Sequence, residues 1–185
     1  MTDSVGDSLD RALESAFTRP IPKSAQAQMK YLVKQLKGTR PVAELLGVTQ
    51  RTVERYVVGK LKRPRQELRD RMEREVKKRW QPQIRARARK KAESTDGLVV
   101  ATRARFGFTA APGTTDDARV RDITQALPPA YADRLFTARE RGATEQQLQR
   151  IAAEGLAEMY FRASNTRAHG LGVEFTDVQQ IEISL

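Results

Sequence analysis

The stretch TRPVAELLGVTQRTVERYVV, residues 39–58, has the pattern of two short helices joined by a tight turn. Gly47 is expected to end the first helix, because glycine takes a positive φ without a Cβ penalty. Thr49 is placed to cap the second helix, whose apolar stripe includes Val53 and Tyr56. This is the pattern of a helix-turn-helix, in which the second helix enters the major groove of DNA. An ordinary helical hairpin is the alternative that these residues alone leave open.

Positive charge is concentrated directly after this motif. The chain carries 34 Lys and Arg against 23 Asp and Glu, a net charge of +11. Residues 60–91 contain 15 of the bases and 4 of the acids, so the remaining residues hold 19 of each and are neutral overall. A polyanion is the natural partner for such a segment. A membrane surface would require apolar or aromatic residues among the bases, and Trp80 alone is too little.

We therefore predict a DNA interface with two kinds of contact. The outward positions of the second helix are expected to read base edges: Gln50, Arg51, Thr52, Glu54 and Arg55. Phosphates are expected to meet Thr49, Lys60, Lys62, Arg63, Arg65, Arg85, Arg87, Arg89, Lys90 and Lys91. The alternative for any run of charges is a face that only meets solvent.

The order of elements predicts a mostly α chain with a smaller α+β part. Helices are expected at 5–17, at 24–37, twice within 39–58 and through 68–80. Pro82 should break the last of these, and the basic run after it is either a helix extension or a flexible arm. The regions expected are a helical helix-turn-helix domain at 1–61, a basic helical connector at 62–96 and a small α+β domain at 97–185.

The second half is expected to run β-α-α-α-β, with its two strands able to pair. The strands are predicted at 98–110 and 173–185, because β-branched and aromatic residues alternate there with polar ones. The helices are predicted from Asp116 to Leu127, from Pro129 to Arg141 and from Thr144 to Tyr160. Thr144 and Gln147 have the spacing of a capping box.

Conventional catalytic sets are not visible in the sequence. There is no cysteine, one histidine (His169) and no phosphate-binding GxxxxGK[ST] loop, so no metal site or nucleophile–base pair is expected. Asp116 and Asp117 suit the first turn of a helix better than a metal site. The loop at 111–115 places Thr114 and Thr115 after a permissive glycine, where phosphate could bind. By their pattern alone, these threonines are better explained as helix caps.

Two longer segments carry a resemblance to a known family. AELLGVTQRTVERYVVGKLKRPR (43–65) and RARFGFTAAPGTTDDARVRDI (103–123), together with the basic tail and the chain length, resemble the telomere-protecting terminal proteins of linear actinobacterial chromosomes. The resemblance covers essentially the whole chain. It implies a protein covalently attached to the 5′ ends of linear chromosomes and plasmids, which primes the DNA synthesis that fills recessed ends.

The resemblance also implies the chemistry and the partners. The priming group would be the hydroxyl of Thr114, with Thr115 as the second choice. The protein would be the substrate of a DNA polymerase rather than an enzyme, so Mg²⁺ and dNTP would be bound by the polymerase and no cofactor by this chain. Telomeric DNA, as single-stranded 3′ overhang or duplex end, a telomere-associated protein and a second copy of the chain are the other expected partners.

Two other classes of function remain open in the sequence. One is a helix-turn-helix transcription regulator whose C-terminal domain dimerises or binds a ligand. The other is an architectural protein that coats DNA ends without covalent attachment. In each case we expect a cytoplasmic protein on the nucleoid with no membrane partner, because no apolar run reaches the length of a membrane span and the first residues, MTDSVGDSLD, do not read as a signal peptide.

Overall fold

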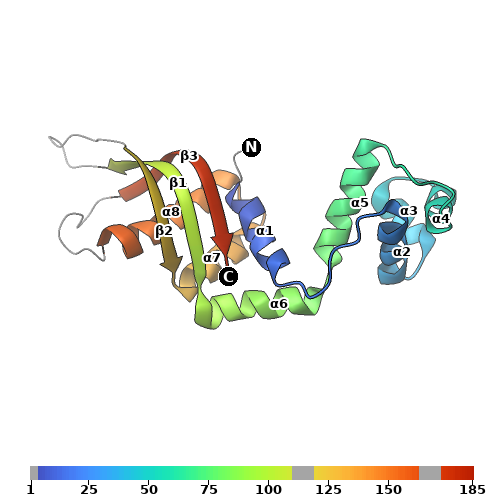
Figure 1. The fold of residues 1–185 in the computed structure, drawn as a ribbon, viewed down its shortest axis with the longest axis horizontal. Coiled ribbons are helices and arrows are strands. Elements are labelled where there is room, and N and C mark those ends of the chain that lie inside the picture. Colours follow the sequence, from blue (N-terminus) through green and yellow to red (C-terminus); the bar gives the residue numbers. More distant parts are fainter. Residues whose placement is uncertain (1–3, 110–118, 163–171) are drawn as a thin grey trace. The chain divides into compact units, whose positions relative to one another are not determined.

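The computed structural model describes residues 4–109, 119–162 and 172–185, and Figure 1 shows its two compact units. One unit, here called the helical unit, comprises Thr18–Pro82. The other, here called the sheet unit, combines Met1–Phe17 with Gln83–Leu185. The described chain is mostly helical with one small three-stranded antiparallel sheet, which confirms the predicted fold class.

The helical unit consists of α2 (Ala25–Leu36), α3 (Thr39–Leu46), α4 (Gln50–Val57) and α5 (Gln66–Arg79). Ser24 caps α2 by accepting a hydrogen bond from the backbone N–H of Ala27, and Gly47 ends α3 with a φ of 63°. The core is built from one apolar stripe of each helix: Met29, Leu32, Val42, Ala43, Leu46, Val53, Tyr56, Leu68, Met72 and Val76. Because α5 contributes three of these residues, it belongs to this domain and is not the connector that the sequence predicts.

The sheet unit contains α1 (Val5–Ser15), α6 (Pro82–Lys91), α7 (Pro129–Glu140) and α8 (Glu145–Leu156). Its strands are β1 (Leu98–Thr109), β2 (Arg119–Leu127) and β3 (Gly172–Ser184), in the order β2-β1-β3. π-Helical segments at Ala92–Asp96 and Ala157–Arg162 extend α6 and α8. The predicted capping box is present at the start of α8, where Thr144 and Gln147 exchange hydrogen bonds.

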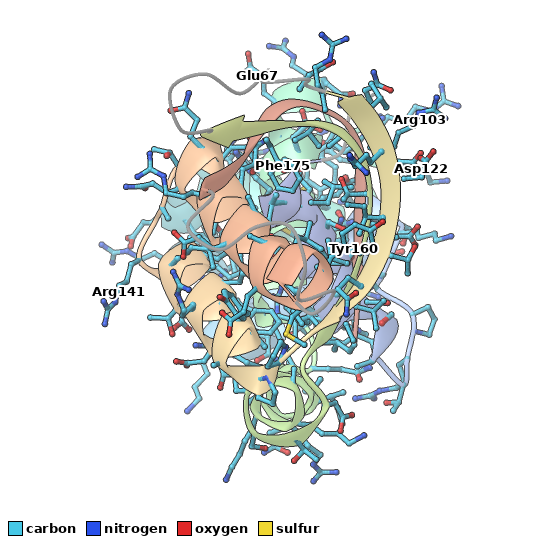
Figure 2. All side chains as sticks on the ribbon, turned by 90° about the vertical axis from the view of Figure 1, so that its left-hand side faces the viewer. Glu67, Arg103, Asp122, Arg141, Tyr160 and Phe175 are labelled. Atoms are coloured by element: carbon cyan, nitrogen blue, oxygen red, sulfur yellow. The ribbon has the colours of Figure 1, made fainter. Side chains whose placement is uncertain are left out.

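Side chains alternate between the two faces of the sheet. Leu98, Val100 and Ala104 of β1 are buried beneath the helices, together with Ile181 and Ile183 of β3. The other face carries exposed residues, and Figure 2 shows Arg103 and Asp122 projecting from it, away from α7 and α8. The predicted pairing of the first strand with the last is confirmed, because β1 pairs antiparallel with β3 from Val99↔Ser184 onward.

The prediction of a helix from Asp116 to Leu127 is wrong for the part that the structure describes. Residues 119–127 form strand β2, so the order of elements is β-β-α-α-β rather than β-α-α-α-β. Val120, Ile123 and Leu127 fit a helical stripe, yet only Ile123 and Leu127 are buried and Val120 is 38% exposed. Ile123 and Leu127 are four residues apart and so also lie on one face of a strand, and pairing with β1 from Leu98 to Phe106 decides between the two.

The predicted domain boundaries differ from the two units. Helix α1 was assigned by the sequence to the helix-turn-helix domain, but Val5, Leu9 and Leu13 are buried in the core of the sheet unit. The backbone N–H of Ile183 donates to Ser8 Oγ at 2.7 Å, and Glu145 accepts hydrogen bonds from the N-terminal N–H groups of α1. The helical unit is therefore inserted between α1 and the rest of the sheet unit.

The turn predicted as a domain boundary at 94–97 lies inside the sheet unit. Gly97 is buried with a φ of 72°, and a Cβ atom on it would lie 2.0 Å from the carbonyl oxygen of Leu127. Glycine is required here both by the backbone conformation and by this close approach. Further along, Tyr160 is 41% exposed rather than part of the apolar stripe of α8, because the helix widens into a π-helical segment after Leu156.

Candidate nucleic-acid interface

The turn between α3 and α4 is closed by hydrogen bonds of its backbone and of Thr49. The Gly47 N–H donates to the carbonyl oxygens of Ala43 and Glu44, and the Val48 N–H donates to Ala43 at 3.0 Å. Thr49 then caps α4, since its Oγ1 accepts from the N–H of Thr52 at 3.2 Å. These contacts satisfy the backbone groups at the turn and fix the direction in which α4 leaves it.

One face of α4 packs on the core and the other meets solvent. Val53 and Tyr56 are buried, while Gln50, Arg51, Glu54 and Arg55 are exposed and Thr52 is half-buried. Gln50 Nε2 donates to Glu54 Oε1 at 2.9 Å, so these two side chains are hydrogen-bonded to each other. Among the described residues, neither the Arg51 nor the Arg55 guanidinium has a hydrogen-bond or ion-pair partner, which leaves both groups available to an external acceptor.

The basic loop after α4, residues 58–65, is held in place by its backbone and its apolar residues. The Leu61 N–H donates to the Arg55 carbonyl oxygen at 3.2 Å, Pro64 is buried, and Leu61 packs against the helical core. The four cations of this loop are all exposed: Lys60, Lys62, Arg63 and Arg65. The loop therefore presents ordered positive charge beside the end of α4, as a phosphate backbone would require.

The helical unit accounts for the whole net positive charge of the chain. Residues 18–82 contain 18 Lys and Arg against 6 Asp and Glu, a net charge of +12. The sheet unit holds the remaining 16 bases and 17 acids, a net charge of −1. The predicted basic segment is 60–91, whereas the positive unit also includes the bases at 19–40, which are not among the predicted DNA contacts. Their signal in the sequence is the absence of any acid between Glu14 and Glu44.

The predicted phosphate contacts on α6 are only partly available. Arg89 forms ion pairs with Glu93 and with Glu140, the latter at 2.8 Å, and Arg85 pairs with Asp10 at 3.1 Å. Lys91 pairs with Asp96 at 2.7 Å, while Arg87 and Lys90 are exposed. Carboxylates of the chain already pair with Arg85 and Arg89, so their assignment to phosphate stays a prediction that would require these pairs to be shared or exchanged.

The pKa of Arg89 is raised by this environment, although burial acts in the opposite direction. Burial, the largest single influence, lowers it, and the hydrogen bonds and charges of Glu93 and Glu140 together outweigh that effect. Its guanidinium also lies 5.7 Å from the centre of the Phe136 ring. Arg89 thus joins α6 to α7 within the sheet unit.

The candidate priming residues Thr114 and Thr115 lie outside the described residues. They belong to 110–118, the segment that connects β1 to β2. Asp116, Asp117 and His169 also lie outside the described residues. Within the described ranges, no three side chains of His, Cys, Asp or Glu come together as a metal site.

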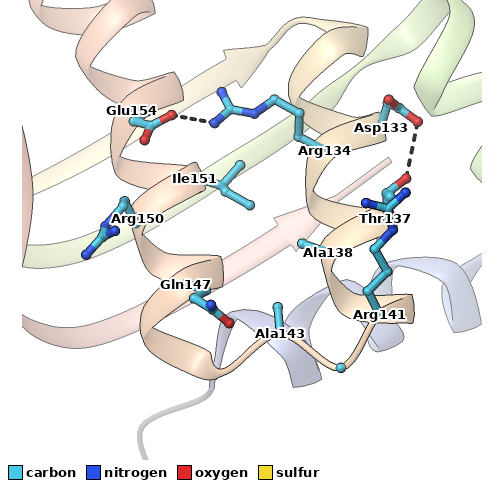
Figure 3. A pocket seen from close by; sticks show the side chains of 11 residues that line it. Asp133, Arg134, Thr137, Ala138, Arg141, Ala143, Gln147, Arg150, Ile151 and Glu154 are labelled. Atoms are coloured by element: carbon cyan, nitrogen blue, oxygen red, sulfur yellow. Dashed lines mark hydrogen bonds and ion pairs between the residues drawn. The ribbon is translucent and has the colours of Figure 1, made fainter.

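A groove of about 630 Å³ runs between α7 and α8 on the sheet unit (Figure 3). Ile151 and Ala138 form apolar parts of its lining, and Arg134 bridges to Glu154 across one end through an ion pair at 2.5 Å. Its volume falls within the usual range for small-molecule sites, but it is open to solvent rather than enclosed. No pattern in the sequence predicts this groove, because side chains of two helices and of the turn between them form it together.

In the part of the chain that the structure covers, no helix combines the length and the apolar composition needed to cross a membrane. Comparisons with known protein families, with curated proteins and with solved structures found no match. The resemblance to the terminal proteins of linear chromosomes therefore stays a prediction.

Proposed function

We propose that this chain is a DNA-binding terminal protein that becomes covalently linked to the 5′ ends of linear chromosomes or plasmids. The DNA-binding part of the proposal rests on one observation. A capped helix presents the unpaired Arg51 and Arg55 beside an ordered basic loop, on a unit with a net charge of +12. Arginine guanidinium groups match the acceptors of guanine in the major groove, and the loop cations match phosphates.

Binding should therefore depend strongly on salt. If six cations contact phosphates, the logarithm of the association constant should fall against the logarithm of salt concentration with a slope of about −5 for duplex DNA or −4 for single strands. A slope near zero would exclude the basic loop from the interface. A titration with random-sequence duplex DNA is enough for this test, because the phosphate term does not depend on sequence.

The priming part of the proposal is supported by the resemblance. The hydroxyl oxygen of Thr114 would attack the α-phosphorus of a dNTP, forming a phosphoester bond. The bond from that phosphorus to the oxygen bridging the β-phosphate would break, and pyrophosphate would leave with the electron pair. The hydroxyl proton would pass to a base in the polymerase, leaving a threonyl nucleotide whose free 3′-OH can be extended.

In this proposal the chain is a nucleophilic substrate. Two Mg²⁺ ions and the dNTP would be held by the partner DNA polymerase, and a telomere-associated protein would help to place both on telomeric DNA. The proposal places the complex on the nucleoid, in the cytoplasm. The sheet unit, which holds the segment with Thr114 and has a net charge of −1, is the part that would enter the polymerase.

Nucleotide transfer can be tested with purified protein, α-labelled dNTP and an extract that contains the polymerase. A label that survives SDS and heat but not protease shows a covalent adduct. Thr114→Ala should abolish this label while DNA affinity and melting temperature are retained, and Thr115→Ala is the matched control one residue away. If Thr114→Ala is still labelled and peptide mapping places the nucleotide on Thr115, Tyr131 or Ser164, the assignment is wrong.

The groove between α7 and α8 supports a second candidate, a helix-turn-helix transcription regulator that binds a small molecule on its sheet unit. Such a protein would bind an internal duplex site without any covalent adduct. Its DNA affinity would change when a ligand fills the groove, and Ile151→Trp, which occupies the groove, would remove that response. A covalent threonyl nucleotide would rule this candidate out as the main activity.

A further inference from the structure

A row of lysines lies on helix α2 and at its C-cap, and none of them is among the predicted DNA contacts. Lys30, Lys34 and Lys37, here called the α2 stripe, are separated by four and three residues. At about 100° per residue, Lys30 and Lys34 lie within an arc of roughly 40° on the helix surface. Lys37 follows the last residue of the helix and is its C-cap, with a left-handed backbone (φ 55°). All three side chains are exposed, and none has a hydrogen-bond or ion-pair partner among the described residues. The stripe is therefore a free cationic surface.

The α2 stripe is not explained by the stability of the helix. A helix dipole favours bases at the C-terminal end, which accounts for Lys34 in the last turn and Lys37 at the C-cap, but not for Lys30 in the middle of the helix. Exposed helix faces usually mix both signs of charge, yet no acid occurs between Glu14 and Glu44. Like charges at a spacing of four residues repel each other, so the helix loses stability by carrying them.

Both ends of the stripe adjoin the helix-turn-helix surface. Gln26 lies one turn before Lys30 on the same side of α2, and its Nε2 donates to the Val57 carbonyl oxygen at 3.1 Å. This end of the stripe therefore borders the end of α4, where the basic loop begins. At the other end Lys37 is followed by Gly38 and the first turn of α3. The core-facing residues Met29 and Leu32 lie on the opposite side of the helix.

We propose that the α2 stripe is a second phosphate-binding surface, which holds nucleic-acid backbone next to the segment that lies on α4. The inference rests on the proposed DNA binding, and it extends the interface beyond the helix-turn-helix. From Lys30 to the end of α2 at Leu36 the helix rises by about 9 Å, the length over which one strand of a duplex presents about two to three phosphates. The matching ligand is a phosphodiester backbone, in flanking duplex or in an adjoining single strand.

The test compares two double variants of the full-length protein with the same loss of charge and the same spacing. Lys30→Gln with Lys34→Gln removes two cations from the stripe. Arg74→Gln with Lys78→Gln removes two exposed cations from α5, on the side of that helix that faces away from the core. Glutamine keeps a similar helix propensity, so both variants should melt close to the unmodified protein. Affinity is measured by fluorescence anisotropy between 50 and 200 mM salt, values chosen to span the range over which phosphate contacts dominate.

Three probes locate the phosphates. One is a duplex of about 12 base pairs, roughly one helical turn; the second is about twice as long; the third is the short duplex with a single-stranded tail. We expect the stripe variant to reduce the salt slope by about 1.8 if the phosphates are in duplex and by about 1.4 if they are in a single strand. Its loss of affinity should then grow about tenfold or about sevenfold from 200 to 50 mM salt. A loss of affinity for the long duplex would show that the stripe contacts flanking duplex. A loss of affinity for the tailed probe alone would show that it contacts the single strand.

Two results would overturn the inference. An unchanged slope for Lys30→Gln with Lys34→Gln would show that the stripe does not contact phosphate. Equal losses of DNA affinity in the two double variants would show that only the net charge of the helical unit affects binding. Failure of the proposed function is separately visible, because the covalent-label assay and the effect of Arg51→Ala on DNA affinity do not depend on the stripe.

Discussion

Replacing Leu9 by alanine tests the insertion of one unit into the other. The residue lies in α1, near the start of the chain, and its side chain is 1% exposed in the core of the sheet unit. The sequence places the same helix in the helix-turn-helix domain. Leu9→Ala should therefore destabilise the sheet unit and leave DNA binding by the helical unit unchanged. Met29→Ala, at a fully buried position of α2, should do the reverse.

The size of the effect follows from burial. Removing a fully buried leucine side chain to alanine costs about 3–5 kcal/mol, since the lost transfer energy is joined by the cost of the remaining cavity. The polar contacts of α1, from Ser8 to Ile183 and from Glu145 to Val5 and Gly6, hold the helix in place, so the cavity should not simply collapse. For a unit of this size, such a loss lowers the melting temperature by about 10 °C or more.

Differential scanning calorimetry and DNA titration together show which unit α1 stabilises. We expect two transitions in the unmodified protein, because each unit has its own core. Leu9→Ala should lower one transition while the salt-dependent DNA affinity stays constant, and Met29→Ala should lower the other and weaken DNA binding. If Leu9→Ala instead lowers the transition that DNA stabilises, α1 belongs to the helix-turn-helix domain and the insertion is wrong.

Three further expectations concern single positions. In thermal unfolding, Gly97→Ala should destabilise the sheet unit by more than about 3 kcal/mol, because the new Cβ would lie 2.0 Å from a backbone oxygen. Gly142→Ala is the control: it has a φ of 78° but open space around it, so it should cost about 1 kcal/mol. Arg51→Ala should weaken DNA binding with little change in melting temperature, while Val53→Asp should unfold the helical unit by burying an unpaired charge. The pKa of the Tyr131 hydroxyl is raised by burial and by a neighbouring glutamate, so stability of the sheet unit should be full below pH about 10 and fall at higher pH; Tyr131→Phe should remove that fall in alkaline denaturation.

Each of these three expectations has a result that would contradict it. Equal losses for the two glycine variants would mean that the contact with Leu127 relaxes without cost. Similar melting temperatures for Arg51→Ala and Val53→Asp would mean that α4 is rotated relative to the face described here. For Tyr131, whose hydroxyl donates to Glu158 at 2.6 Å, an unchanged alkaline profile in the phenylalanine variant would assign the pH dependence to other groups.

Local signals in the sequence were sufficient where a structure is decided by neighbours along the chain. Gly47 and Thr49 determine the turn before α4, Thr144 and Gln147 the start of α8, and Pro82 the break between α5 and α6. Each of these acts on backbone groups within about four residues, so its effect can be read without knowing the fold. The exposed and buried faces of α4 follow from the same local periodicity.

Only the tertiary structure decided which surfaces meet. An amphipathic pattern shows that Leu9 will be buried but not against which core, and here the sheet unit buries it. The residues of 119–127 satisfy both a helical and a strand pattern, and the hydrogen bonds offered by β1 select the strand. Likewise, Arg87 and Arg89 look alike in sequence, but only Arg89 is paired with Glu140, about fifty positions later. Partners distant in sequence carry no local signal, and they determine which cations remain unpaired in the folded chain.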